Sequence, residues 1–193
     1  MTTTTTTPAT DTVTTTAART TTATPYTARP IAPPALGELR VTDDAGRPTV
    51  PFPDTEGGAP LRCCLRRSAP GERIALVSYA PLRRWAAETG AAPGAYDEQG
   101  PVFIHAEDCE GPDIDTLPFT DSHRTLRRYS AEGHILGGRL VEGSAAAFPQ
   151  ALTEAFDDPA VALVHVRAVE YGCFLYEVRR GNEVRRGFEE GRG

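Results

Sequence analysis

The sequence contains no lysine, and all 20 residues counted as lysine or arginine are arginine. This absence excludes a lysine Schiff base, a lysine anchor for pyridoxal phosphate and a phosphate-binding loop that depends on lysine. Acidic residues number 26, so the net charge is -6 and the sequence pI is about 5.3. Nucleic-acid binders normally carry a basic face and a high pI, and we therefore expect no nucleic-acid partner.

Long apolar runs are also missing. No stretch approaches the roughly 18 consecutive apolar residues of a membrane span, and the N-terminus lacks the basic and apolar regions of a secretory signal. The chain has only four cysteines, two of them adjacent, which is a poor disulfide framework for 193 residues. Reduced thiols in a bacterial cytoplasm, with no membrane partner, are therefore expected.

Composition divides the chain into three parts. Residues 1–35 are rich in threonine and proline and offer little apolar surface, which predicts a disordered tail. Residues 181–193 are charged and glycine-rich, and we expect a flexible C-terminus. The intervening residues 36–180 are long enough to form one domain with a hydrophobic core.

Short apolar runs separated by glycine and proline favour strands within this domain. The pattern predicts strands at 37–41, 73–79, 101–106, 124–130, 135–141, 161–169 and 173–179. Phe148, Leu152, Ala155 and Phe156 repeat with helical spacing, and a shorter helix is expected around 81–88. These elements predict an α+β domain with a mainly antiparallel sheet, covered on one face, and one clear amphipathic helix.

The last hairpin also has a predicted register. A three-residue loop at 170–172 places Val164, Val166 and Ala168 opposite Val178, Tyr176 and Phe174 as one apolar face. His165 then lies opposite Glu177, and Arg167 lies opposite Leu175, on the other face.

His105 and Cys109 form the first candidate site. Phe103 and His105 share one face of a strand, which places His105 at the strand end and Cys109 in the following loop. An imidazole and a thiolate at this spacing can bind zinc or form a thiolate–imidazolium pair. The alternative is a buried Cys109 and a histidine that is satisfied by ordinary hydrogen bonds.

The second candidate site combines His165 and Arg167 with Cys173 across the hairpin. Glu177 would accept a hydrogen bond from His165, and Arg167 would bind a carboxylate or phosphate. The alternative is a solvated cross-strand ion pair with no function.

Cys63 and Cys64 form a third candidate, flanked by arginines that would favour a reactive thiolate. Adjacent side chains of an extended segment point to opposite faces, so at most one of the two is expected in any site. The alternative is a buried thiol beside surface arginines. Asp108, Glu110, Asp113 and Asp115 around Cys109 are interpreted as a solvated acidic loop, because the EF-hand spacing is missing.

The ordered set of short motifs resembles the bacterial family known as domain of unknown function 1203. The resemblance extends from about Ala59 to Arg180. It rests on Cys64-Leu65-Arg66, Pro70-Gly71-Glu72, Gly100-Pro101-Val102-Phe103-Ile104-His105, Cys109-Glu110, Arg127, Tyr129, Val164-His165-Val166-Arg167 and Gly172-Cys173. Members often carry a further cysteine three positions before the Cys-Leu pair, where this chain has Leu61. The resemblance implies no particular reaction, but it groups His105, Cys109, His165, Arg167 and Cys173.

Three functional hypotheses follow from these residues. The first is a small cytosolic enzyme that acts on an anionic small molecule, in biosynthesis or housekeeping. Its catalytic residues would be His105, Cys109, His165, Arg167 and Cys173, with Arg167, Arg127 and Tyr129 binding the substrate. The second is a ligand- or metal-binding module without catalysis. The third is a structural metal or thiol cluster that only holds the strand-rich domain together. If a metal such as zinc or iron is present, its expected ligands are Cys64, His105, Cys109 and Cys173. The sequence assigns neither a substrate nor an oligomeric state.

Overall fold

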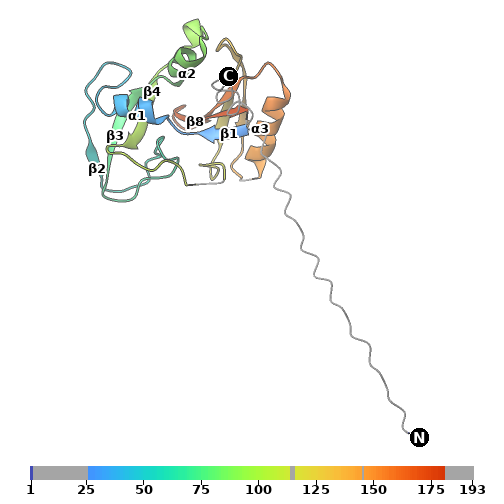
Figure 1. Ribbon diagram of the computed structural model, residues 1–193, viewed down its shortest axis with the longest axis horizontal. Coiled ribbons are helices and arrows are strands. Elements are labelled where there is room, and N and C mark those ends of the chain that lie inside the picture. Colours follow the sequence, from blue (N-terminus) through green and yellow to red (C-terminus); the bar gives the residue numbers. More distant parts are fainter. Residues whose placement is uncertain (2–25, 114–115, 145, 181–193) are drawn as a thin grey trace.

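The computed structural model describes residues 1, 26–113, 116–144 and 146–180 and has the predicted α+β architecture with antiparallel sheets (Figure 1). One sheet has five strands in the order β1-β8-β7-β5-β6, and the other has three in the order β2-β3-β4. The strands are β1 (Tyr26–Arg29), β2 (Phe52–Asp54), β3 (Glu72–Tyr79), β4 (Gly100–His105), β5 (Arg124–Tyr129), β6 (Ile135–Val141), β7 (Leu163–Ala168) and β8 (Phe174–Arg180). The helices are α1 (Pro33–Leu39), α2 (Pro81–Thr89), α3 (Ala147–Asp157) and the short 3₁₀ helix η1 (Gly94–Tyr96).

Six of the seven expected strands and both expected helices are confirmed, within a few residues at their ends. Helix α3 buries the apolar stripe that its helical spacing indicates, and its Pro149 lies in the first turn, where no helical hydrogen bond is lost. Helix α2 begins at Pro81 and ends before Gly90, which has a left-handed φ of 77°.

The folded domain begins earlier in the chain than residue 36, where the sequence pattern places its start. Tyr26 begins β1, which pairs with β8, and Ile31 is buried beyond it. The strand expected at 37–41 is wrong, because α1 runs from Pro33 to Leu39 and buries Leu36 and Leu39 on one side. The remainder of the expected tail, residues 2–25, and the expected flexible segment 181–193 lie outside the described residues.

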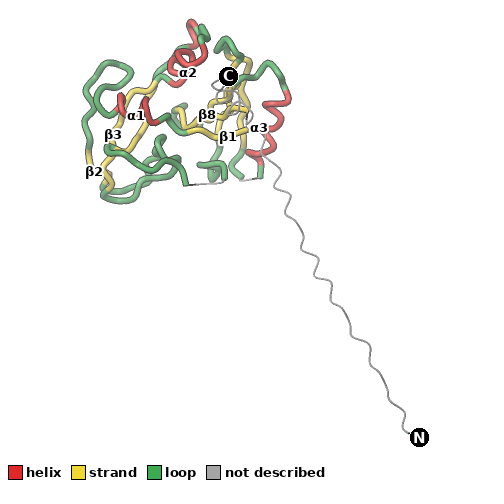
Figure 2. Tube along the Cα trace, viewed as in Figure 1, coloured by secondary structure: helices red, strands yellow, loops and turns green. Residues whose placement is uncertain are grey.

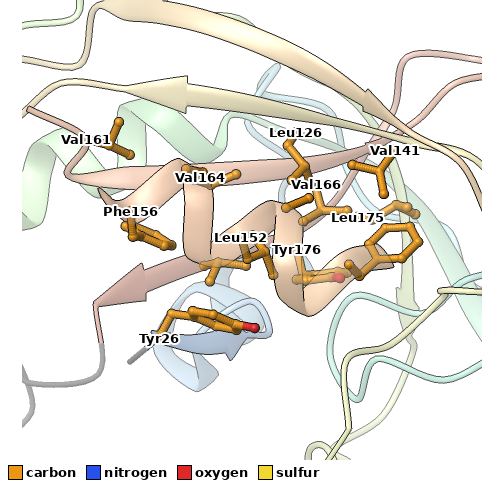
Figure 3. Close-up of a cluster of buried hydrophobic side chains, with 14 of the residues drawn as sticks. Tyr26, Leu126, Val141, Leu152, Phe156, Val161, Val164, Val166, Leu175 and Tyr176 are labelled. Atoms are coloured by element: carbon orange, nitrogen blue, oxygen red, sulfur yellow. The ribbon is translucent and has the colours of Figure 1, made fainter. Parts of the chain in front are cut away.

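The five-stranded sheet is covered on both faces rather than one. Helix α3 packs on one face over a core that includes Leu152, Phe156 and Tyr176 (Figure 3). On the other face, Leu82 and Trp85 of α2 pack against Tyr129 and Leu163. Phe174 of β8 joins the core of the three-stranded sheet and so links the two sheets. Figure 2 shows α3 on one side of the molecule and the β2–β3 region on the other.

The predicted register of the last hairpin is confirmed at His165 opposite Glu177 and at its two neighbours. A β-bulge then shifts the pairing, so Arg167 lies opposite Phe174 instead of Leu175. A bulge inserts one extra residue and exchanges the faces beyond it. Leu175 therefore enters the α3 core, whereas Phe174 contributes to the core of the three-stranded sheet. No helix among the described residues is long and apolar enough to cross a membrane.

Candidate metal centre

A compact turn positions the two adjacent cysteines. The backbone N–H of Leu65 donates to the carbonyl of Leu61 at 3.0 Å, and Leu65 has a φ of 57°, in the left-handed region that non-glycine residues rarely adopt. The chain therefore reverses immediately after Cys64 instead of remaining extended. This reversal brings both thiols to the same side, with the Cys63 Sγ 4.0 Å from the Cys64 Sγ.

The turn packs against the end of strand β4. Leu61 forms a parallel bridge with Phe103, and the N–H of Arg62 donates to the Phe103 carbonyl at 2.9 Å. His105, the last residue of β4, consequently lies over the cysteines. Its Nδ1 is 3.4 Å from the Cys63 Sγ and 3.8 Å from the Cys64 Sγ.

Cys109, in the loop after β4, completes a group of four donors. One donor atom from each of Cys63, Cys64, His105 and Cys109 lies within 4.8 Å of all the others. A zinc ion bound tetrahedrally at the usual bond lengths would separate two sulfurs by about 3.8 Å and a sulfur and a nitrogen by about 3.6 Å. The separations of 4.0, 3.4 and 3.8 Å among Cys63, Cys64 and His105 are close to these edges. Cys109 lies within 4.8 Å of the other donors, so its side chain would move inward to complete the site.

Backbone N–H groups support negative charge on both buried sulfurs. The N–H of His105 donates to the Cys63 Sγ at 3.2 Å, and the N–H of Arg66 donates to the Cys64 sulfur. Hydrogen bonds from Cys63 and from the backbone N–H of Arg66, helped by the electrostatic effect of the nearby His105, outweigh burial and lower the pKa of the Cys64 thiol to about 6. The pKa of the Cys63 thiol is raised, because this thiol donates the hydrogen bond to Cys64 and because it is buried. The turn therefore favours the thiolate of Cys64, the form in which cysteine binds metals.

The other ring nitrogen of His105 faces an ion pair. Its Nε2 is 3.2 Å from Nη2 of Arg66 and 3.7 Å from Oε2 of Glu72. Glu72 is held by both terminal nitrogens of Arg66, at 2.6 and 2.9 Å, and by the backbone N–H of Ala69 at 2.8 Å. These hydrogen bonds, that of Arg66 foremost, lower the pKa of Glu72 to about 2. The Glu72 carboxylate lies beyond hydrogen-bond distance of Nε2, and a small side-chain shift would make it the carboxylate partner that metal-bound imidazoles usually have.

A cavity of about 500 Å³ adjoins the four donors. Cys64, His105 and Cys109 line it together with Arg66, Glu110 and Asp113, whereas Cys63 does not line it. Two carboxylates of the expected acidic loop therefore line this cavity. A third, that of Asp108, is exposed and pairs with Arg40, and Asp115 lies outside the described residues.

Three of the four residues expected as metal ligands, Cys64, His105 and Cys109, belong to this group, but Cys173 does not. Cys173 lies in the turn between β7 and β8, where its Sγ is 3.7 Å from the Tyr171 carbonyl oxygen. Cys63 takes the fourth position. The expectation that at most one of the adjacent cysteines would join a site is wrong, because it assumed an extended segment where the chain forms a turn. The left-handed Leu65 that creates this turn has no recognisable signal in the sequence.

His165 also lies outside the metal centre. Its ring is fully buried between those of Tyr129 and Phe174, at centroid distances of 4.6 and 5.0 Å. Among the described residues, neither ring nitrogen has a hydrogen-bond partner, and the expected hydrogen bond to Glu177 is absent. Glu177 pairs with Arg179 at 2.6 Å. The face on which His165 lies was expected to be solvated, but α2 and the three-stranded sheet cover it.

Arg127 and Arg167 form a separate cluster around Glu98. Arg127 donates to the Glu98 carboxylate at 2.6 Å, and Arg167 donates to the same oxygen. The Nε of Arg167 also donates to the Gly172 carbonyl at 2.8 Å. Tyr129, the third residue expected to bind substrate, is completely buried beside His165. Of the five residues expected to be catalytic, only His105 and Cys109 therefore lie together in the metal centre.

A family model described as a protein of unknown function (DUF1203) matches residues 58–180. The chain belongs to this family. The DUF1203 match confirms the resemblance noted in the motifs, and it includes all four donors while leaving β1 and α1 outside. The family description assigns no reaction. No curated protein and no solved structure matches the chain.

Proposed function

We propose that this DUF1203 protein binds one zinc ion through Cys63, Cys64, Cys109 and His105. The observation that carries the proposal is the convergence of four donor atoms within 4.8 Å. Three thiolates and one imidazole suit zinc, which prefers four tetrahedral sulfur and nitrogen ligands in structural sites. Such a site has no free coordination position, which favours a binding and stabilising role over catalysis by the metal.

The position of the donors supports a role in holding the fold together. Two come from the turn at 61–66, one from the end of β4 and one from the following loop. Next to the turn, Arg62 donates to the Phe174 carbonyl of β8 at 2.8 Å. A metal ion here would therefore fasten a segment that lies between the two sheets. Metal binding to preorganised ligands adds to the free energy of folding.

Elemental analysis of tag-free protein, combined with thiol titration before and after unfolding, tests the proposal. We expect about one equivalent of zinc and three thiols that react only after unfolding or chelation. Iron in place of zinc would retain the site and change its metal. Cys63→Ser should abolish stoichiometric zinc, whereas Cys173→Ser, a matched replacement outside the group, should retain it. The proposal would be refuted if the protein contained no zinc after refolding with excess zinc. It would also be refuted if Cys63→Ser and Cys173→Ser contained equal amounts of zinc.

A second candidate function, thiol chemistry on an anionic small molecule, is supported by the cavity. Cys64 lines this space beside Arg66 and His105. Arg66 would attract the anionic group, and the Cys64 thiolate would be the nucleophile. Metal-free protein should then react faster with iodoacetate than with neutral iodoacetamide at Cys64, as mapped by mass spectrometry. Equal rates for both reagents, or reaction at Cys173 first, would count against this function.

A further inference from the structure

The three thiols of the metal centre are not equivalent as disulfide partners. Cys63 and Cys64 are joined by one peptide unit, which fixes their Cα atoms about 3.8 Å apart. Most disulfides need a Cα separation of roughly 4.4–6.8 Å, so a bond between these two neighbours is disfavoured. Cys109 comes from a different segment, and its Sγ lies within 4.8 Å of both. Any disulfide formed at this site should therefore include Cys109.

Access to the cavity selects the partner of Cys109. Cys64 and Cys109 both line the cavity, and Cys109 is partly exposed. Cys63 is only 2% exposed, does not line the cavity and accepts the backbone N–H of His105. A small oxidant entering the cavity thus meets Cys64 and Cys109 first. The loop that carries Cys109 is outside any helix or strand, so a shift of Cys109 towards Cys64 would break no helix or sheet hydrogen bond at this position.

We propose that the metal centre is an oxidation-sensitive switch, in which a hydroperoxide joins Cys64 to Cys109 and releases the metal. The proposal rests on the metal binding proposed above. In the first step one thiolate attacks a peroxide oxygen, the O–O bond breaks, and a sulfenic acid and hydroxide form when hydrogen peroxide is the oxidant. In the second step the other thiolate displaces hydroxide from that sulfenic acid and forms the S–S bond. Two sulfurs are oxidised by two electrons in total, and the peroxide is reduced.

Loss of two of the four ligands explains the release. A disulfide sulfur is a poor ligand compared with a thiolate, which is the metal-binding form of cysteine. Only Cys63 and His105 would remain, and two donors do not hold zinc in a tetrahedral site. Reduction of the disulfide by a dithiol would restore both thiolates, so rebinding of added zinc is expected.

The test uses the full chain loaded with zinc and treated with increasing hydrogen peroxide in the presence of a chromogenic zinc chelator. We expect about one zinc released per peroxide consumed, a Cys64–Cys109 disulfide in the peptide map, and recovery of zinc binding after dithiothreitol treatment. Cys109→His, which keeps a metal-binding donor at this position but cannot form a disulfide, should need at least tenfold more peroxide for half-release. Cys173→Ser should behave like the unmodified chain.

Three results would overturn the switch while leaving metal binding intact: retention of zinc after complete oxidation of Cys109, release without a disulfide, or a disulfide that contains Cys63. Equal peroxide sensitivity of zinc-loaded Cys109→His and the unmodified chain would also overturn it. Failure of metal binding itself is recognised earlier, because the reduced and reconstituted protein would contain no zinc before peroxide is added. In that case both proposals fall.

Discussion

The Sγ of Cys63 lies 3.4 Å from Nδ1 of His105, although 42 positions separate these residues in the chain. The contact is reinforced by the backbone, because the N–H of His105 donates to the same sulfur at 3.2 Å. It forms because Leu61 and Arg62 pair with Phe103, two residues before the histidine. The metal centre is thus attached to the strand pairing of β4 and should respond to any change that loosens it.

Removal of the metal should lower thermal stability measurably. If zinc is present at about a hundred times its dissociation constant, it stabilises the folded state by about 2.7 kcal/mol, and for a domain of this size chelation should lower Tm by roughly 5–10 °C. Calorimetry with and without a strong chelator measures the shift. Cys63→Ser should start at the lower Tm and show no further shift, whereas Cys173→Ser should shift like the unmodified chain. An unchanged Tm in chelator would contradict a stabilising metal.

Glu72→Gln should weaken zinc binding without removing a ligand. The carboxylate of Glu72 lies 3.7 Å from Nε2 of His105 and would accept its proton once Nδ1 binds the metal. Loss of such a partner typically reduces metal affinity by about 10–100-fold. Competition with a chelator of known affinity measures the change. Glu107→Gln is the control, because Glu107 is exposed and pairs with Arg73; similar affinities for the two variants would show that Glu72 has no such role.

His165→Phe should remove a pH dependence of stability. Burial, with the nearby positive charges of Arg167, Arg127 and Arg179, holds the pKa of His165 well below 6.5, so the folded state keeps the ring neutral. The unfolded chain binds a proton below about pH 6.5, and stability therefore falls as pH decreases through that value, by at most about 1.4 kcal/mol per pH unit. Urea unfolding at pH 7.5 and 5.5 measures the slope.

The replacement places a third aromatic ring between Tyr129 and Phe174 and cannot be protonated. We expect a shallower pH slope for His165→Phe than for the unmodified chain. His123→Gln, at an exposed histidine, should leave the slope unchanged. A slope that is the same in all three proteins would mean that His165 titrates alike in the folded and unfolded states.

Asp43→Asn should destabilise the fold and reduce its sensitivity to acid. The buried Asp43 carboxylate accepts the N–H groups of Ala45 and Arg47 and that of Ser78 in β3, at 2.9–3.1 Å. Burial raises the pKa of Asp43, but the hydrogen bonds from Arg47, Ser78 and Ala45 outweigh it and lower the pKa to about 2. The side-chain amide of asparagine would place its N–H group against these backbone N–H donors. This should lower the free energy of unfolding by about 1–3 kcal/mol at pH 7.

The sign of the acid effect follows from the lowered pKa. The stability contributed by Asp43 is fully present above about pH 4 and is lost as pH falls from 3.8 towards 2, because the unfolded chain takes up the proton first. Denaturant unfolding over this range should show a steeper loss for the unmodified chain than for Asp43→Asn. Asp121→Asn, at an exposed position, is the control. Equal slopes for Asp43→Asn and the unmodified chain would contradict the assignment.

Part of the candidate site was predictable from the sequence. The alternation in Val102-Phe103-Ile104-His105 predicts a strand that ends at the histidine, and the spacing to Cys109 predicts a thiol in the following loop. Both are confirmed, since they depend only on local pattern. The participation of both Cys63 and Cys64 was not predictable, because it depends on the left-handed backbone of Leu65 and on the packing of that turn against β4.

The sequence by itself determined the α+β class, six of the eight described strands, two of the three described α-helices and the family, because these depend on local periodicity and ordered motifs. Tertiary structure alone decided which residues meet. His165 is buried because α2 and a second sheet cover its face, and Arg167 pairs with Phe174 because one bulge shifts the register. Packing over the whole domain also leaves Cys173 outside the metal centre and brings Cys63 into it. Such contacts between distant segments are not encoded by any local sequence pattern.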